Sequence, residues 1–473
     1  MEILKNHKNT IIYSIFLILF IVCGYIVGLN HEAWVDEAQH WLLARDCSVF
    51  ELVTQRLKYE GHPLLWYLIL KVFIFFKLPY EKFFIIPLIF STIGVYILFF
   101  KIKFPMILKV VTPFTYYIFY QYSVISRSYC LVLPTLTLTA WFWKDRFYHP
   151  FRYLTCLVLL FNICFYTQVL AVCLLLYYFY EAIKREFFKS KTSEMALFFS
   201  IFAFFILLNF YILHPASDFP FKAYWHFRAF EIEKMFNIFA LSTFATKISL
   251  PITLLSIVLY FALPITFYKN FKNSFLYFYL ITIQLIVYAL FYYQEWHLGI
   301  IFLILMFVFW IGYENNFKPD KKGEVFLVIL TMILGIQLNW SLVSSIYDIK
   351  NLYCASKNVA KFIKENNYDK NKIYMLGYRP LAINPYFDKN IYQNSTQDKT
   401  FYIWQRIPND KLKTKNPEIF IVAKQRLFKD MAWLDIVEND KYKKYTFDGN
   451  MVFKNKIRES NAYFVYIRKD LIK

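Results

Sequence analysis

Long apolar runs separated by short polar segments fill the first 350 residues of the chain. Each run is about 17–22 residues long, the length that an α-helix needs to cross ~30 Å of hydrocarbon. The runs predict about eleven membrane-spanning helices, near residues 11–29, 83–100, 106–122, 128–143, 152–166, 168–183, 195–213, 250–268, 275–292, 298–313 and 325–345. We therefore predict an all-α, polytopic membrane domain over residues 1–350.

Short basic segments between the apolar runs predict the orientation of this domain. Lysine and arginine concentrate in the cytoplasmic loops of membrane proteins. Five basic clusters occur, at residues 101–109, 144–152, 184–191, 269–272 and 318–322. If all five are cytoplasmic, the amino terminus is also cytoplasmic and the carboxyl terminus is extracytoplasmic.

The same rule decides how the segment Leu64–Leu78 is interpreted. If it crossed the membrane fully, every later basic cluster would face outward, against the positive-inside rule. The segment is also short and carries Lys71 and Lys77. We therefore expect a juxtamembrane helix or a partial insertion, within an extracytoplasmic first loop of residues 30–82.

The hydrophobic pattern changes after residue 350. Short apolar runs now alternate with polar turns, which is typical of a small α/β domain. A helix is predicted over Ala355–Glu365, and strands over Lys372–Leu376, Phe401–Trp404 and Ile419–Val422. Residues 351–473 are therefore predicted to form an extracytoplasmic domain.

Composition agrees with a membrane protein, because 58% of the 473 residues are hydrophobic and 22% are aromatic. The net charge of +20 lies largely in short loops, which indicates topology rather than nucleic-acid binding. Among the seven cysteines, only Cys47 and Cys354 are predicted outside the membrane, and one such pair is weak evidence for a disulfide. No P-loop or G-x-G-x-x-G motif occurs, which argues against a nucleotide-driven pump.

Ionisable side chains gather in the first outer loop. Charged groups beside a bilayer are costly and so indicate a functional site. Asp36 and Glu37 begin an amphipathic helix that runs to Arg45, and a capping box at Ser48 and Glu51 predicts a second helix. Two such helices would fold the loop back on itself. This would bring a second group, Glu60 and His62, close to Asp36.

Other outer turns add cations and imidazoles to the same face. Arg127 and Tyr129 lie between two predicted spans, Lys222 and Arg228 lie in a long loop, and His297 precedes the tenth span. Carboxylates, imidazoles and cations together suit a phosphate-bearing substrate and a proton transfer.

Four short motifs resemble the GT-C superfamily of membrane glycosyltransferases, most closely its bacterial protein-mannosyltransferase-like and aminoarabinose-transferase-like group. They are Trp34-Val-Asp-Glu-Ala38, Glu60-Gly-His-Pro-Leu64, Ser126-Arg-Ser-Tyr129 and Trp296-His-Leu-Gly299. Relatives often have a second proline where this chain has Leu64, a small departure. The arrangement of predicted spans and loops resembles that family over residues of about 10–345.

The resemblance implies a GT-C-like fold and an enzyme of the bacterial inner (cytoplasmic) membrane. Its donor would be a polyprenyl-phosphate-linked sugar, and its acceptor would be a glycan, a lipid or a protein. The transfer would be a single displacement that inverts the anomeric configuration of the sugar. By resemblance, Asp36 and Glu37 are the candidate catalytic residues. Asp36 is the base, and Glu37 orients Asp36 or the acceptor. The candidate phosphate-binding residues are Arg127, Tyr129, Lys222, Arg228 and His297, and Glu60 and His62 are candidate ligands of a divalent metal.

Each of these residues also has a simpler interpretation. Asp36 could serve only as a helix cap. Arg127 could extend to the lipid headgroups. His62 and His297 are then packing residues. At the level of the whole protein, the alternative is a flippase or transporter for a lipid-linked sugar. A transporter is expected to carry charges along a path through its spans rather than on one face.

Overall fold

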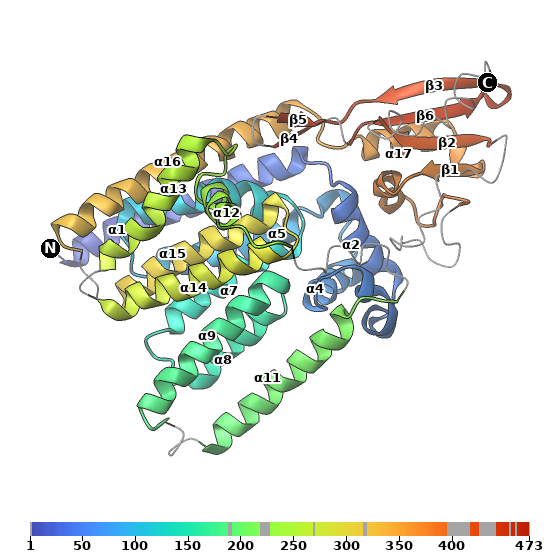
Figure 1. Ribbon diagram of the computed structural model, residues 1–473. Coiled ribbons are helices and arrows are strands. Elements are labelled where there is room, and N and C mark those ends of the chain that lie inside the picture. Colours follow the sequence, from blue (N-terminus) through green and yellow to red (C-terminus); the bar gives the residue numbers. More distant parts are fainter. Residues whose placement is uncertain are drawn as a thin grey trace.

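The computed structural model is mostly helical and carries a small sheet near the carboxyl end (Figure 1). It describes residues 2–187, 192–217, 228–267, 270–315, 319–394, 417–424, 441–453, 456–458 and 461–472. The predicted strand at 401–404 and the candidate residue Lys222 lie outside these ranges.

Eight helical segments of the described chain are long and apolar enough to cross a membrane. They contain α1 (Glu2–Asn30), α5 (Ile85–Phe100), α9 (Phe165–Lys184), α11 (Thr192–Leu213), α13 (Leu250–Ala262), α14 (Phe271–Leu290), α15 (Gly299–Glu314) and α16 (Lys321–Lys350). On α1, α11 and α13, large apolar side chains remain exposed, as expected for surfaces that face lipid. These features are consistent with a multi-pass membrane protein.

The other three predicted spans correspond to shorter helices. The run near 106–122 is divided into α6 (Met106–Val111), a 3-10 turn (Thr112–Phe114) and the π-helix η5 (Tyr116–Val124). Pro113 lies in that turn and Thr115 is extended, so the run does not form one straight helix. The run near 128–143 forms the turn η6 (Ser128–Leu131) followed by α7 (Val132–Phe142). The run near 152–166 corresponds to α8 (Pro150–Phe161).

α15 lies in the interior of the helical domain. Every residue from Ile300 to Ile311 is buried. The helix packs against α7, α12 (Ile232–Phe244) and α14, and its first residue is Gly299. A Cβ at Gly299 would lie 2.5 Å from the Tyr122 hydroxyl, so a larger residue would separate α15 from η5. α15 and η5 therefore pack closely at Gly299.

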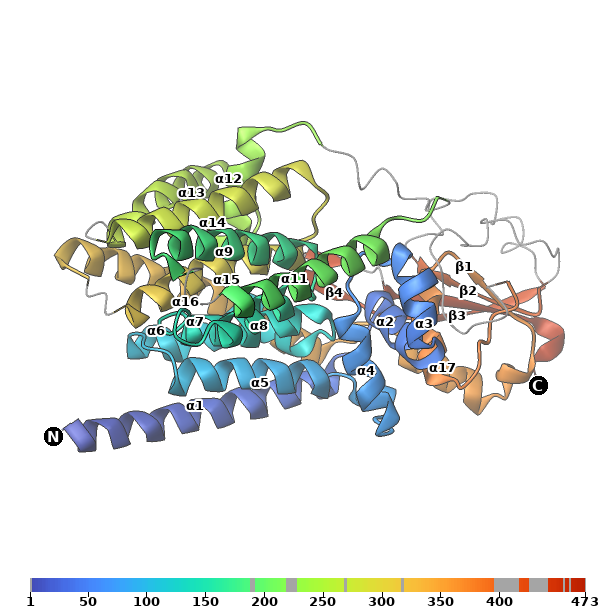
Figure 2. The same ribbon diagram turned by 90° about the horizontal axis from the view of Figure 1, so that it is seen from below.

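Short helices of the first loop lie at one end of the bundle (Figures 1 and 2). They are α2 (Val35–Asp46), α3 (Val49–Glu51) with the turns η1 (Leu52–Arg56) and η2 (Leu57–Tyr59), and α4 (Leu65–Phe75), followed by η3 (Tyr80–Lys82). α4 is only about 16 Å long, too short to cross a bilayer. This length agrees with the prediction that Leu64–Leu78 does not span the membrane.

The carboxyl-terminal domain contains a four-stranded sheet. Its strands are β1 (Ile373–Leu376), β2 (Ile419–Ala423), β6 (Tyr463–Arg468) and β3 (Tyr442–Phe447), in that spatial order. β1 and β2 are parallel and the other pairs are antiparallel. β2 is buried along its whole length, as its run of apolar residues predicts for a central strand. β4 (Met451–Phe453) and β5 (Lys456–Arg458) form a separate hairpin.

Two helical segments connect this domain to the membrane part. The buried face of α17 (Ser356–Glu365) includes Val359 and Ile363, and the helix packs against β6 and η11 (Arg379–Tyr386). η11 in turn packs against α2. Arg45 on α2 donates a 2.9 Å hydrogen bond to the carbonyl of Phe387. The carboxyl-terminal domain therefore lies directly over the first loop, where the candidate residues gather.

Candidate functional site

An ion pair joins the first loop to the turn after η5. Asp36 stands in the first turn of α2, and its Oδ2 lies 3.0 Å from Nη1 of Arg127. The Asp36 side chain is 21% exposed, whereas that of Arg127 is 9% exposed. Two candidates that are 91 positions apart in sequence therefore meet, with the carboxylate on the more accessible side.

Two aromatic rings hold the Arg127 guanidinium in place. Its central carbon lies 5.3 Å from the ring centre of Tyr129 and 5.0 Å from that of Trp296. Trp296 also packs edge-on against Trp34. The buried Nε of Arg127 has no hydrogen-bond partner in the described part of the protein. The guanidinium is thus held by cation–π contacts and by the ion pair with Asp36, while its buried Nε is left without an acceptor.

Asp36 lies in surroundings that suit a base. Burial raises the pKa of its carboxyl above the usual value, and this effect is opposed by the positive charges of Arg127 and Arg379. Arg379 belongs to η11 of the carboxyl-terminal domain. A carboxylate with a raised pKa accepts a proton more readily, which general-base catalysis requires.

Glu37 has a different environment from Asp36. It is fully buried, and one oxygen accepts a 2.5 Å hydrogen bond from the backbone N–H of Ser126. The other oxygen accepts from the N–H of Trp34 at 3.1 Å and lies 3.1 Å from Nε2 of His31. Glu37 therefore fixes the turn that carries Arg127 to the start of α2. Both of its oxygens are occupied by these contacts, and its carboxylate is fully buried, unlike that of Asp36.

A buried network behind Glu37 includes two ionisable residues that the sequence reasoning missed. Nδ1 of His31 lies 2.8 Å from Oδ2 of Asp348, in the last turns of α16, and the Tyr120 hydroxyl donates to the same oxygen at 3.1 Å. All three side chains are buried or nearly so. The available signal was Asp348 itself, a carboxylate at the end of an apolar span. Its partners are too distant in sequence for any local pattern to show.

The pH dependence of stability is expected to report on His31. Burial alone would lower its pKa, but the carboxylates of Asp348 and Glu37 outweigh burial and raise the pKa to about 10. A raised folded-state pKa gives stability that is complete below the unfolded value of about 6.5 and is lost as pH rises toward about 10. The melting temperature in detergent should therefore fall across this window. The slope should be smaller in His31→Gln, and an unchanged slope in that variant would contradict the assignment; His149→Gln, an exposed histidine, is the control.

Glu60, His62 and His40 form a polar cluster near Arg127. The His40 and His62 rings meet edge to face at 5.2 Å, and His62 Nδ1 lies 3.5 Å from the Ser128 hydroxyl. Burial, together with the positive charge of Arg127, lowers the pKa of His62 to about 3. Burial, His62 and Arg127 lower the pKa of His40 well below its usual value. Both imidazoles are therefore neutral near pH 7.

The same cluster does not fit the metal site that the resemblance implied. One oxygen of Glu60 accepts a hydrogen bond from Gln39 at 2.9 Å, and the other is 4.0 Å from Nε2 of His40. Within the described ranges, no group of three or more His, Cys, Asp or Glu side chains is placed to hold a metal ion. We therefore assign no catalytic step to a metal.

His297 joins the site through aromatic neighbours. Its ring lies 5.6 Å from that of Tyr129 and 5.1 Å from that of Tyr166. Nδ1 accepts a 2.9 Å hydrogen bond from the backbone N–H of Gln294, so the ring's remaining proton is on Nε2. His297 is therefore held as a neutral donor beside the ring that supports Arg127.

Arg228 lies further out. Its guanidinium stacks 5.5 Å from the ring centre of Tyr292, and its backbone N–H donates to the carbonyl of Leu290. The structure thus brings together Asp36, Arg127, Tyr129, Glu60, His62 and His297. It places Arg228 at the edge of this group.

All seven cysteines, including Cys47 and Cys354, are free thiols.

None of the protein-family models, curated proteins and solved structures compared with this chain matches it. Any function for the site therefore has to be inferred from the chemistry of the side chains described above.

Proposed function

We propose that this protein is a GT-C-like membrane glycosyltransferase. It would transfer a sugar from a polyprenyl-phosphate-linked donor to a glycan, lipid or protein acceptor on the extracytoplasmic side of the cytoplasmic membrane. The observation that carries the proposal is the pairing of Asp36 with Arg127 at 3.0 Å. A carboxylate beside a guanidinium supplies the base and the phosphate-binding cation that this reaction needs.

The ion pair supports a way for the donor to activate the base. A donor phosphate competes with Asp36 for the Arg127 guanidinium, since phosphate accepts hydrogen bonds in the same forked geometry as a carboxylate. Once Arg127 binds the phosphate, the Asp36 carboxylate is free to accept a proton. Its pKa, already raised by burial, then favours proton transfer from the acceptor.

In the proposed step, Asp36 removes the proton from an acceptor hydroxyl while the hydroxyl oxygen attacks the anomeric carbon of the sugar. The new carbon–oxygen bond forms as the bond between the anomeric carbon and the phosphate oxygen breaks. The polyprenyl phosphate leaves with the bonding electron pair, and Arg127 neutralises the charge that develops on it. Because attack and departure occur on opposite faces, the anomeric configuration inverts.

Release of polyprenyl phosphate tests the proposal. The full-length protein would be reconstituted in liposomes with undecaprenyl phosphates that carry radiolabelled glucose, galactose, mannose or arabinose. Membrane vesicles from cells that lack the gene would supply the acceptor. We expect undecaprenyl phosphate and a labelled acceptor to form from at least one donor. Movement of the intact labelled lipid between leaflets, with no release of undecaprenyl phosphate, would instead identify a flippase or transporter.

Arg127→Lys is expected to weaken donor use strongly. Lysine keeps the charge but loses the planar fork and the contacts with Tyr129 and Trp296. Loss of a charged hydrogen bond of ~1.5–3 kcal/mol predicts that kcat/KM for the donor falls about tenfold to hundredfold. Steady-state kinetics of undecaprenyl phosphate release measures this. Arg152→Lys is an exposed control, and equal values for both variants would exclude Arg127 from donor binding.

A further inference from the structure

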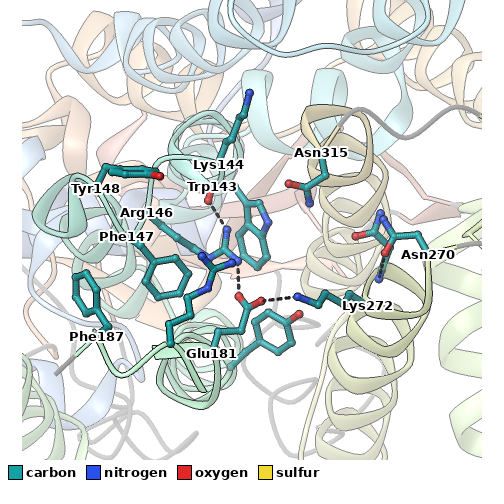
Figure 3. Close-up of a pocket in the computed structure, with 13 residues that line it drawn as sticks. Trp143, Lys144, Arg146, Phe147, Tyr148, Glu181, Phe187, Asn270, Lys272 and Asn315 are labelled. Atoms are coloured by element: carbon teal, nitrogen blue, oxygen red, sulfur yellow. Dashed lines mark hydrogen bonds and ion pairs between the residues drawn. The ribbon is translucent and has the colours of Figure 1, made fainter. Parts of the chain in front are cut away.

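A cavity of about 590 Å³ opens near the carboxyl-terminal end of α9 (Figure 3). α9 connects this cavity to the candidate site, because Tyr166, near His297, lies in its first turn and Glu181 lies near its end, about 22 Å further along the helix. The charged residues that line the cavity are Lys144, Arg146, Glu181, Arg185 and Lys272. Positive charge predominates, since four cations and one carboxylate line the cavity.

Glu181 organises the floor of this cavity. Its carboxylate accepts a hydrogen bond from Nη2 of Arg146, and its other oxygen lies 3.8 Å from Nζ of Lys272, as the dashed lines in Figure 3 show. Arg146 is further held between the rings of Trp143 and Phe147, at 4.2 and 4.9 Å. One carboxylate thus holds two cations from separate segments and neutralises only one of them.

Two buried N–H groups at the cavity have no hydrogen-bond acceptor in the described part of the protein. They are Nδ2 of Asn273 and Nε of Arg146, and both residues are at least nine-tenths buried. An orphaned buried donor costs free energy unless a ligand or water satisfies it. Together with the excess of positive charge, this surplus of donors favours an anionic ligand in the cavity.

Exposed apolar side chains surround the cationic mouth of the cavity. Lys272 is 73% exposed, and the apolar side chains next to it and across the opening are exposed too, with Phe271 at 80% and Tyr148 at 81%. Ile183, on the last turn of α9, is also exposed. A ligand that enters here meets cations with its headgroup and apolar side chains with its tail.

We propose that this cavity binds the phosphate headgroup of an anionic phospholipid. Lys144 and Lys272 pair with the phosphate, and the exposed apolar side chains contact the acyl chains. Basic pockets between membrane helices bind anionic lipid headgroups in this way. The short loops around the cavity belong to the basic clusters predicted to be cytoplasmic, so the lipid would come from the cytoplasmic leaflet. The proposal does not depend on the catalytic role of Asp36.

Thermal unfolding of the full-length protein in dodecylmaltoside tests this site. Phosphatidylglycerol is expected to raise the melting temperature by roughly 3 °C or more at saturation. Phosphatidylcholine and inorganic phosphate are each expected to have little effect. An equal shift with inorganic phosphate would overturn the lipid assignment, and an equal shift with phosphatidylcholine would overturn the requirement for negative charge.

The variant Lys144→Gln/Lys272→Gln locates the effect. Both side chains are exposed, so the changes leave the buried Arg146–Glu181 pair in place and the protein should fold. At least half of the phosphatidylglycerol shift should disappear. Lys184→Gln is the matched control, because Lys184 is exposed at the same end but points to Tyr180 rather than to the cavity. Equal loss in both variants would show that lipid binds the basic surface generally and would end the proposal.

Discussion

Asp36→Asn is expected to lower the kcat for sugar transfer by about 10²–10⁴-fold, the contribution of a positioned general base. The amide has the size of the carboxylate but no charge, so it competes less with the donor phosphate for Arg127, and donor binding should not weaken. The loss should therefore appear in kcat rather than in KM. Release of undecaprenyl phosphate from the labelled donors measures both constants.

Asp46→Asn is the matched control for this result. Asp46 is the last residue of the same helix and pairs with Arg45 at 2.8 Å, away from Arg127. Its variant should retain transfer, and both proteins should elute alike on size exclusion. If Asp36→Asn transferred sugar at the wild-type rate, the proposed mechanism would be wrong. If both variants lost activity equally, the loss would reflect the fold of α2 rather than a base at position 36.

Hydrophobic length predicted the long spans well because that signal is local. Each of α1, α11 and α16 contains one long apolar run. The polar residues that end each run are its neighbours in sequence. The prediction of a single span at 106–122 was wrong, because the length of an apolar run does not show where the helix breaks. A proline at 113 and the extended Thr115 divide it, and the π-helix that follows is buried against other helices, not lipid.

The candidate site was predictable only in part. The amphipathic pattern up to Arg45 placed Asp36 at a helix start, as found, and α2 with the following turns brings Glu60 to Gln39. The contact with Arg127 is long-range, and the sequence indicated only that both residues lie on one face. Trp296 was missed as a support for Arg127, because an aromatic residue near a span end is ordinarily an interfacial anchor.

Glu37 illustrates what sequence could not distinguish. Two adjacent carboxylates at a helix start look chemically equivalent, yet successive helix positions point about 100° apart. One points toward Arg127 and the partly exposed site, while the other points to Ser126 and His31 in the interior. The pair is therefore divided between a candidate base and a residue that positions the site.

Breaking the buried network is expected to have the largest effect on stability. Asp348→Leu removes one of two carboxylates around His31, leaves its Nδ1 without a partner and deprives the Tyr120 hydroxyl of its acceptor. Removal of one partner from a buried ion pair costs about 3–5 kcal/mol, because the remaining groups stay buried without compensation. Equilibrium unfolding in mixed micelles of dodecylmaltoside and sodium dodecyl sulfate measures the change in free energy.

Two further variants distinguish a lost network from a merely altered helix. Asp320→Asn, at the other end of α16, changes only the N-cap that accepts from Gly323 and should cost about 1 kcal/mol or less. The double variant His31→Leu/Asp348→Leu should be less destabilised than the sum of its two single changes, because removing both partners leaves fewer buried polar groups unpaired. If the free-energy changes were simply additive, His31 and Asp348 would not be coupled. The turn that holds Arg127 would then depend on Glu37 through its bonds to Trp34 and Ser126 alone.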